Sequence, residues 1–376
     1  MKQRFKRKAS LELSSTSGCA RLYLRRTDNI SKPVTIVGGG LAGLALGIGL
    51  RRRDVPVTVW EAGRYPRHRV CGEFISGKGA AVLTRLGLRP QIEAAGAFSA
   101  STAMFVAGPH CSPVRALPEP ALCLSRFYLD ALLAKCFQEL GGDLRENARW
   151  TWTEQNESIV RAAGRRTQSK EQGWRWFGVK AHVSASTPVA LAADLEMHAS
   201  SRGYIGVNRI DNGQTNVCGL FRARPGEHLP VSRLDLLHGE PGSRLYGLLQ
   251  EVSFDQSSFC SVAGLALQPH RAAEAEACCI GDALTMTPPV TGNGMSMALE
   301  SAEFAIEPVA AYSRGELSWA EARRDVAIAC DAAFGQRLAW ARWLQRLMFL
   351  PVLRSGVGRV LLRSNTLWDV MFRNTR

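Results

Sequence analysis

The sequence predicts an α/β protein in which a doubly wound parallel sheet is joined to an inserted, mainly antiparallel β-sheet and to a helical C-terminal tail. Two glycine-rich segments, about 240 residues apart, each follow a short apolar strand and precede a helix. This order is typical of parallel β–α units. Apolar and polar residues alternate in the stretches 174–183 and 204–220, which predicts the antiparallel strands.

The composition is that of an ordinary folded protein. The chain has 376 residues, of which 46% are hydrophobic and 21% charged, and these values exclude disordered and collagen-like classes. No run of eighteen apolar residues is present, so we expect no membrane-spanning helix. The ten cysteines are scattered without a CxxC pair, which indicates free thiols in a cytoplasmic protein and no metal site.

The formal net charge of +14 belongs to the two ends of the chain. Residues 1–33 hold nine Lys/Arg against two acidic residues, and residues 337–376 hold eight Arg against one Asp, so each end carries +7. No nucleic-acid motif accompanies these clusters, and we expect no nucleic-acid partner. We interpret residues 1–33 as a flexible basic extension, with a targeting peptide as the alternative.

The first glycine-rich segment predicts a Rossmann-type dinucleotide site. Its parts, in chain order, are the strand Val34–Val37, the motif Gly38-x-Gly40-x-x-Gly43, the helix Leu44–Leu50, the strand Val55–Trp60 and Glu61. The first glycine allows a tight turn, the second lets the backbone approach a pyrophosphate, and the third lets helix and strand pack closely. An acid at the end of the second strand suits ribose hydroxyls and disfavours a 2′-phosphate. The segment therefore predicts FAD or NAD rather than NADP.

The second glycine-rich segment favours FAD over NAD. The buried strand Ala277–Ile280 leads into Gly281-Asp282, and Gly292-x-Gly294 opens the next helix. An Asp at the end of a strand can hold a ribityl hydroxyl. Glycines before a helix let the backbone approach a planar ring, and the helix N-terminus stabilises negative charge on a reduced flavin.

With these motifs the chain resembles the p-hydroxybenzoate-hydroxylase-fold flavoproteins, which include aromatic hydroxylases, geranylgeranyl reductases and flavin halogenases. The resemblance covers residues 34–335 through the two glycine-rich segments and two further ones, Arg69-Val-Cys71-Gly72-Glu73-Phe-Ile-Ser76 and Ser125-Arg126-x-x-Leu129-Asp130. The first of these further segments is most similar to the geranylgeranyl-reductase branch and its bacterial relatives. In such proteins this loop runs beside the flavin ring, and the arginine that matches Arg126 lies against the cofactor. The resemblance therefore implies cofactor-binding roles for Arg69, Cys71, Gly72, Glu73 and Arg126.

The chain departs from this family at three places. The hydroxylases have an Asp-Gly motif that serves both FAD and NAD(P)H, whereas this chain has Ala163-Gly164, so NAD(P)H is only a possible transient electron donor beside a partner reductase. The reductases have a lipid-site motif for which this chain has 198–204 instead. Trp174-Arg-Trp176 is similar to a halogenase motif, but Phe-Gly follows it in place of Ile-Pro.

Lys180 and His182 are the candidate catalytic side chains. Both lie on the predicted strand 177–183, and a period of two places them on one face. If that face looks at the flavin, one of them could bind an anionic substrate or move a proton. The alternative is a solvated strand face or a satisfied polar pair.

The sequence predicts four parts. They are the extension 1–33, a discontinuous FAD-binding domain of residues 34–95, 119–170 and 265–335, a substrate domain of residues 96–118 and 171–264, and a basic amphipathic helical segment 336–376. Tryptophans and arginines at helical spacing in the last part are typical either of a helix at a membrane surface or of one that covers a substrate tunnel.

From these features we expect an FAD-dependent monooxygenase of secondary metabolism. It would hydroxylate an apolar aromatic or polyketide-like small molecule through a flavin hydroperoxide. The alternative is a flavin-dependent, geranylgeranyl reductase-like reduction of a carbon–carbon double bond in a prenyl or related lipid. A third hypothesis is binding of the basic ends to an anionic membrane, as a peripheral contact of a cytoplasmic protein.

Overall fold

The fold is taken from a computed structural model of the chain. It describes residues 31–152, 157–165, 173–227, 232–350 and 356–376, and Ser31–Arg376 form one compact unit. Residues 1–30 of the predicted basic extension lie outside the described residues.

A five-stranded parallel sheet, sheet A, carries the first glycine-rich segment. Its strands, in spatial order, are β14 (Cys278–Cys279), β8 (Ile159–Arg161), β1 (Val34–Val37), β2 (Val57–Trp60) and β7 (Asp143–Arg145). Every neighbouring pair is parallel. The next strand of this sheet along the chain, β2, lies on one side of β1, and β8 lies on the other. A crevice forms at the carboxyl end of a strand where the order reverses in this way, so this topology places a binding site after β1.

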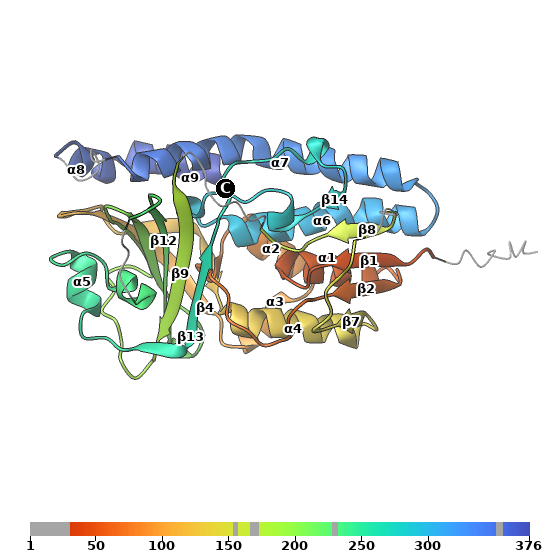
Figure 1. Ribbon diagram of the computed structural model, residues 1–376, viewed down its shortest axis with the longest axis horizontal. Coiled ribbons are helices and arrows are strands. Elements are labelled where there is room, and N and C mark those ends of the chain that lie inside the picture. Colours follow the sequence, from red (N-terminus) through yellow and green to blue (C-terminus); the bar gives the residue numbers. More distant parts are fainter. Residues whose placement is uncertain (1–30, 153–156, 166–172, 228–231, 351–355) are drawn as a thin grey trace, which may run out of the picture. The chain divides into compact units, whose positions relative to one another are not determined.

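Six of the described helices form the layer beside sheet A. They are α1 (Leu41–Arg51), α2 (Lys78–Arg85), α3 (Arg89–Ala94), α4 (Arg126–Glu139), α6 (Gly294–Ser313) and α7 (Trp319–Met348). Of these, α1, α4 and α7 contact its strands, and the others pack on these helices or on one another. In Figure 1, α6 and α7 lie on one side of α1 and α4 lies on the other. Residues 41–50 of α1 are all buried, as expected for a helix that is apolar on every side.

A nine-stranded sheet, sheet B, forms the other half of the molecule. Its strands, in spatial order, are β13 (Phe254–Ala263), β9 (Arg175–Val183), β12 (Thr215–Ala223), β11 (Gly203–Arg209), β10 (Leu195–Ala199), β4 (Phe98–Ala107), β6 (Arg115–Cys123) and β3 (Phe74–Ile75), with β5 (His110–Cys111) paired to β4. Only the β10–β4 pair is parallel among the described strands of this sheet. The predicted fold class is therefore confirmed.

The two faces of sheet B differ. Apolar residues of β9, among them Val179 and Ala181, join a core with Leu245 and Leu249 of the short helix α5 (Arg244–Leu249). The opposite face looks toward sheet A. The predicted turn 211–213 joins β11 to β12, with Asn212 at φ +54° and Gly213 at φ +69°, a conformation that Asn and Gly tolerate.

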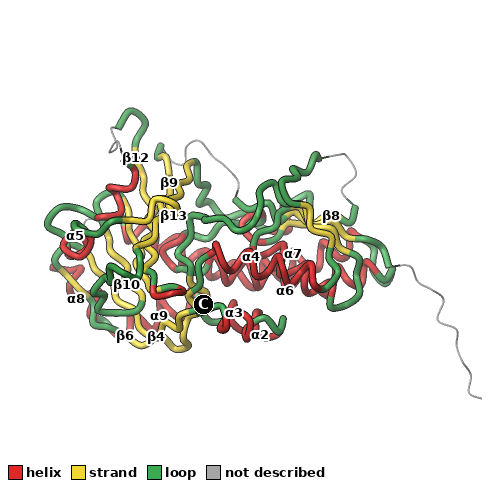
Figure 2. Tube along the Cα trace, turned by 90° about the horizontal axis from the view of Figure 1, so that it is seen from below, coloured by secondary structure: helices red, strands yellow, loops and turns green. Residues whose placement is uncertain are grey.

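The C-terminal segment is helical, as the sequence predicts. Helix α7 begins with a capping box in which the Ser318 hydroxyl accepts a hydrogen bond from the Glu321 N–H. Helices α8 (Gly356–Arg363) and α9 (Asn365–Thr375) follow. Figures 1 and 2 both show the C-terminal end of the chain in the middle of the molecule, beside sheet B. In the part of the chain that the structure describes, no helix is both long and apolar enough to span a bilayer.

Candidate functional site

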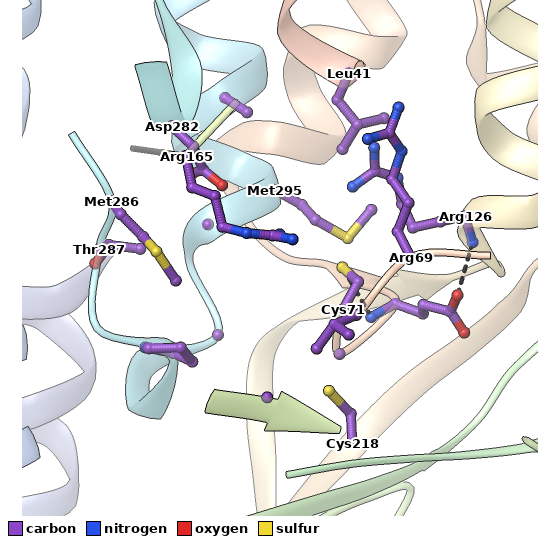
Figure 3. A pocket seen from close by; sticks show the side chains of 18 of the residues that line it. Leu41, Arg69, Cys71, Arg126, Arg165, Cys218, Asp282, Met286, Thr287 and Met295 are labelled. Atoms are coloured by element: carbon purple, nitrogen blue, oxygen red, sulfur yellow. Dashed lines mark hydrogen bonds between the residues drawn. The ribbon is translucent and has the colours of Figure 1, made fainter. Parts of the chain in front are cut away.

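A cavity of about 620 Å³ begins at the carboxyl end of β1 and reaches the face of sheet B (Figure 3). Most residues that the sequence predicts to bind a cofactor line it. They are Gly38, Gly40, Glu61, Arg69, Cys71, Gly72, Glu73, Arg126, Gly281, Asp282, Gly292 and Gly294. Residues that are far apart in the sequence therefore meet at the crevice that the sheet topology predicts.

The first glycine-rich segment has the predicted division of roles. Gly38 has φ +115°, which favours glycine, and Gly40 is the N-cap of α1, where an added Cβ would meet nothing within 4 Å. This open side lets a ligand approach the backbone and the N-terminus of α1. Gly43 does not line the cavity: its Cβ would lie 1.9 Å from the Gly38 carbonyl oxygen, so its role is the close packing of α1 on β1.

Glu61 is buried and accepts several hydrogen bonds from the protein. One carboxylate oxygen accepts from the Gly39 N–H at 3.0 Å, and the other accepts from the Gly63 N–H at 2.8 Å and from Arg67 at 2.6 Å. Arg69 lies 3.5 Å from the first oxygen. These donors hold the carboxylate at the cavity wall, where it retains acceptor capacity for ribose hydroxyls.

Asp130 brings two predicted arginines together. Its carboxylate accepts hydrogen bonds from Arg126 at 2.7 and 2.9 Å and from Arg69 at 3.0 Å. Burial lowers the pKa of the Arg126 guanidinium, but the charge and hydrogen bonds of Asp130, together with those of Cys71, outweigh burial and the net pKa is raised. The pair presents positive charge to the cavity, which suits a pyrophosphate.

The turn at Glu73 is conformationally unusual. Glu73 has φ +56° and is fully buried. Its carboxylate accepts hydrogen bonds from the Arg126 N–H at 2.9 Å and from His182 Nε2 at 2.6 Å, and it forms an ion pair with Lys180 at 3.1 Å. Burial raises the pKa of Glu73, but the His182 hydrogen bond and the Lys180 charge lower it below its usual value.

Lys180 and His182 share one face of β9, as predicted, and both meet Glu73. Neither lines the cavity, and their exposed fractions are 0% and 1%. Lys180 also lies 3.3 Å from Nδ1 of His68, whose pKa is lowered to about 4 by burial and by the charges of Lys180 and His182. The arrangement is a satisfied polar cluster behind the cavity wall, and a catalytic role for either residue stays a prediction.

The second glycine-rich segment places a carboxylate in the cavity. Gly281 has φ +60° and Gly292 has φ +64°, so both hold turns that favour glycine. Burial raises the pKa of Asp282, and the charges of Arg126 and Arg165 only partly offset this effect. Figure 3 shows Asp282 beside Arg165, whose side chain extends into the cavity.

The residues present fit FAD. The cavity brings together the N-termini of α1 and α6, the arginines Arg69, Arg126 and Arg165, and the acids Glu61 and Asp282. These groups have counterparts in the pyrophosphate, ribose and ribityl groups. The indole N–H of Trp150, which lines the cavity near Glu61, is buried and has no acceptor among the described residues. A bound nucleotide would supply polar partners that the protein leaves open here.

Sequence reasoning missed several residues of the site. Asp130 is the last residue of the Ser125–Asp130 motif, and its ion pairs with Arg69 and Arg126 give it a supporting role. Arg165 follows the Ala163-Gly164 departure directly, but no pattern indicated that its side chain enters the cavity. No local sequence pattern marks Trp150 or Asn216 as a site residue. Only the fold brings Trp150 to the cavity wall and Asn216 to the loop at Gly72.

Comparison with known proteins agrees with this geometry. Residues 31–176 match the family described as FAD binding domain. No curated protein sequence matches the chain.

Several solved structures share the fold. The flavin-dependent brominase Bmp2 is 15% identical, with a TM-score of 0.70 over 92% of this chain and 93% of that chain. A flavoprotein/dehydrogenase from Cytophaga hutchinsonii is 16% identical, with a TM-score of 0.67 over 86% and 87%. PqsL of P. aeruginosa, in complex with 2-aminobenzoylacetate, is 15% identical, with a TM-score of 0.66 over 87% and 99%. The chain therefore has the p-hydroxybenzoate-hydroxylase fold of FAD-dependent oxidoreductases and carries an FAD-binding domain in residues 31–176.

Proposed function

We propose that this protein is an FAD-dependent monooxygenase that hydroxylates an apolar aromatic or polyketide-like small molecule. The observation that carries the proposal is the continuity of the cavity. It runs from the two glycine-rich segments to a wall of mainly apolar side chains, among which Glu196, Asn208 and Arg376 also line the cavity. Bound FAD would supply the oxygen chemistry, and the protein would orient the substrate and exclude water.

The apolar wall comes from sheet B, from the loops before α6 and from the C-terminal helices. Its members are Met104, Phe105, Leu117, Met197, Leu220, Leu265, Met286, Val290, Leu344, Trp368, Met371 and Phe372. Rings and thioethers of this kind suit a flat or flexible apolar ligand.

Helix α9 presents one face to this cavity. The lining residues Trp368, Met371, Phe372 and Thr375 recur at the spacing of one helical stripe. Trp368 packs against Phe105 of β4 with ring centroids 5.7 Å apart. This arrangement favours the hypothesis that the tail covers a substrate tunnel.

The solved structures support the proposal by analogy of fold. PqsL was crystallised with 2-aminobenzoylacetate, an aromatic compound. Bmp2 is a brominase, but the halogenase-like segment of this chain points elsewhere: Trp176 packs against Phe349 at 5.2 Å and does not line the cavity. We therefore prefer hydroxylation. Reduction of a prenyl double bond stays the alternative, and no observation on the described residues favours it.

Anaerobic reduction tests the proposal. The purified protein should show a flavin absorption spectrum, and NADH, NADPH or a partner reductase should bleach it. Readmission of O₂ with an apolar aromatic compound should then give a product that is heavier by one oxygen atom, by mass spectrometry. Oxygen consumption without any oxygenated product across such compounds would contradict the monooxygenase. A protein that binds no FAD would contradict the whole proposal.

We further propose a peripheral membrane contact through residues 336–376. Val357 and Val360 of α8 have exposed fractions of 56% and 69%, and Arg359 and Arg363 lie on the same short helix. An apolar face flanked by arginines suits an anionic interface. Pelleting with phosphatidylserine vesicles should be salt-sensitive, and replacement of Val357 and Val360 by Ser should abolish it.

A further inference from the structure

Sheet B turns a row of polar side chains toward the loop at Cys71. His182 of β9, Asn216 of β12 and Asn208 of β11 are directly opposite one another in the antiparallel register, so they share a face. All three have exposed fractions of 2% or less. A buried polar row of this kind is costly unless it has partners.

Asn216 donates its amide hydrogens to backbone carbonyls of that loop. Its Nδ2 donates to the Gly72 carbonyl at 2.9 Å and to the Cys71 carbonyl at 3.2 Å, with Asn208 Oδ1 at 3.4 Å. Its own Oδ1 is buried without a hydrogen-bond partner among the described residues. The side-chain amide therefore holds two carbonyls through Nδ2 while its Oδ1 accepts no hydrogen bond from the described residues. A buried polar atom without a partner needs an explanation.

The next residue of the same loop, Glu73, is held in a strained conformation. Glu73 keeps φ +56° while Lys180, His182 and the Arg126 N–H bind its carboxylate. The Glu73 N–H donates to the Cys71 thiol at 3.4 Å. A non-glycine residue persists in this region only when its surroundings determine it, and such residues cluster at ligand sites.

This geometry decides where the Gly72 N–H points. In a trans peptide the carbonyl and the N–H point in opposite directions. Because the Cys71 carbonyl is turned to Asn216, the Gly72 N–H faces away from sheet B. Figure 3 draws Cys71 between Cys218 of sheet B on one side and Met295 and Arg165 on the other. The Gly72 N–H has no protein acceptor among the described residues.

We propose that Asn216 is a positioning residue that holds the Cys71–Gly72 peptide with its N–H toward the cavity, as a hydrogen-bond donor to an electron-rich edge of the bound flavin ring. The inference rests on the FAD binding of the proposed function. It assigns the Glu73 cluster to the same task, because Lys180 and His182 fix the residue that follows Gly72. A donor held in advance stabilises negative charge on the reduced ring more than it stabilises the neutral oxidised ring.

The sequence allows a direct test of this N–H. Only two Cys–Gly peptides occur in the chain, Cys71–Gly72 and Cys218–Gly219. Protein with ¹³C in cysteine carbonyls and ¹⁵N in glycines therefore gives two carbonyl-filtered amide signals. Gly219 also lines the cavity but lies inside the ladder of β12 between β9 and β11, so it serves as the internal control for the presence of a ligand alone. Titration with FAD should move the Gly72 proton downfield, with a much smaller change at Gly219.

The Asn216→Leu variant tests the clamp itself. It should still bind oxidised FAD but lose the downfield shift of Gly72. It should also weaken the binding of reduced FAD about tenfold more than that of oxidised FAD, which corresponds to a reduction potential about 30 mV lower. If Leu prevents folding, Asn216→Thr suits a strand and cannot reach both carbonyls.

The outcomes separate this inference from the proposed function. A wild-type protein that binds no FAD overturns the function. A protein that binds FAD with an unmoved Gly72 signal, or an Asn216 variant that folds, binds FAD and keeps the wild-type potential, overturns the clamp alone.

Discussion

Two carboxylates at the cavity, Asp282 beside sheet A and Glu73 beside sheet B, are held in opposite ways. On the sheet A side, Asp282 faces the cavity, and burial raises the pKa of its carboxyl group. On the sheet B side, the carboxylate of Glu73 is bound by three protein groups, and its pKa is lowered. Asp282 is thus left for a ligand, whereas Glu73 is used to hold the wall. The comparison teaches that a buried acid near a cofactor site serves chemistry or architecture according to which partners the protein itself provides.

The largest expected effect on stability comes from a substitution on the sheet B side. Glu73→Gln removes the charge opposite Lys180 and leaves a fully buried ammonium without its ion pair. We expect the free energy of unfolding to fall by about 4 kcal/mol, measured by urea denaturation at pH 7.

A matched substitution at an exposed ion pair shows how much of this loss is due to burial of the pair. Glu93 pairs with Arg89 at 2.7 Å, with both side chains about half exposed. Glu93→Gln should change the free energy of unfolding by less than about 1 kcal/mol. Equal effects of the two substitutions would mean that Lys180 is not a buried charge, and the contrast between the walls would fail.

The sheet A side was predictable from the sequence because its signals are local. Gly38, Gly43 and Gly281 act through the backbone of the segment in which they stand, so spacing reveals them. The sheet B side was not predictable in this way. Period two places Lys180 and His182 on one face, but the partner of that face, Glu73, lies more than one hundred residues away. Asn216 meets the same loop only because β12 pairs with β9 in one register, and no local pattern encodes that register.

The next largest effect concerns the packing of helix α1 on strand β1, on the sheet A side. Gly43→Ala should lower the free energy of unfolding by about 2–3 kcal/mol, because the new methyl group would overlap the Gly38 carbonyl and push α1 from β1. Displacement of the N-terminus of α1 should also abolish FAD binding, measured by absorbance after gel filtration.

Gly335 is the control for this substitution, because it also lies inside a helix, α7. A Cβ at Gly335 would meet nothing within 4 Å. Gly335→Ala should therefore stabilise the protein by up to about 1 kcal/mol. If Gly43→Ala were equally benign, the close contact of helix and strand would not be what the third glycine provides.

The smallest effect has the opposite sign. Because the pKa of Asp282 is raised in the folded state, its ionised form opposes folding above that pKa, and the cost disappears as the pH falls toward the usual value. Asp282→Asn removes the charge, so without FAD the melting temperature at pH 7 should rise by about 2 °C. The advantage over the wild type should shrink as the pH falls toward the usual pKa of an aspartate. FAD affinity should fall at least tenfold, because a charged acceptor for a ribityl hydroxyl is lost. A variant with lower stability at pH 7 would place Asp282 with Glu73, as an acid that the protein itself has already paired.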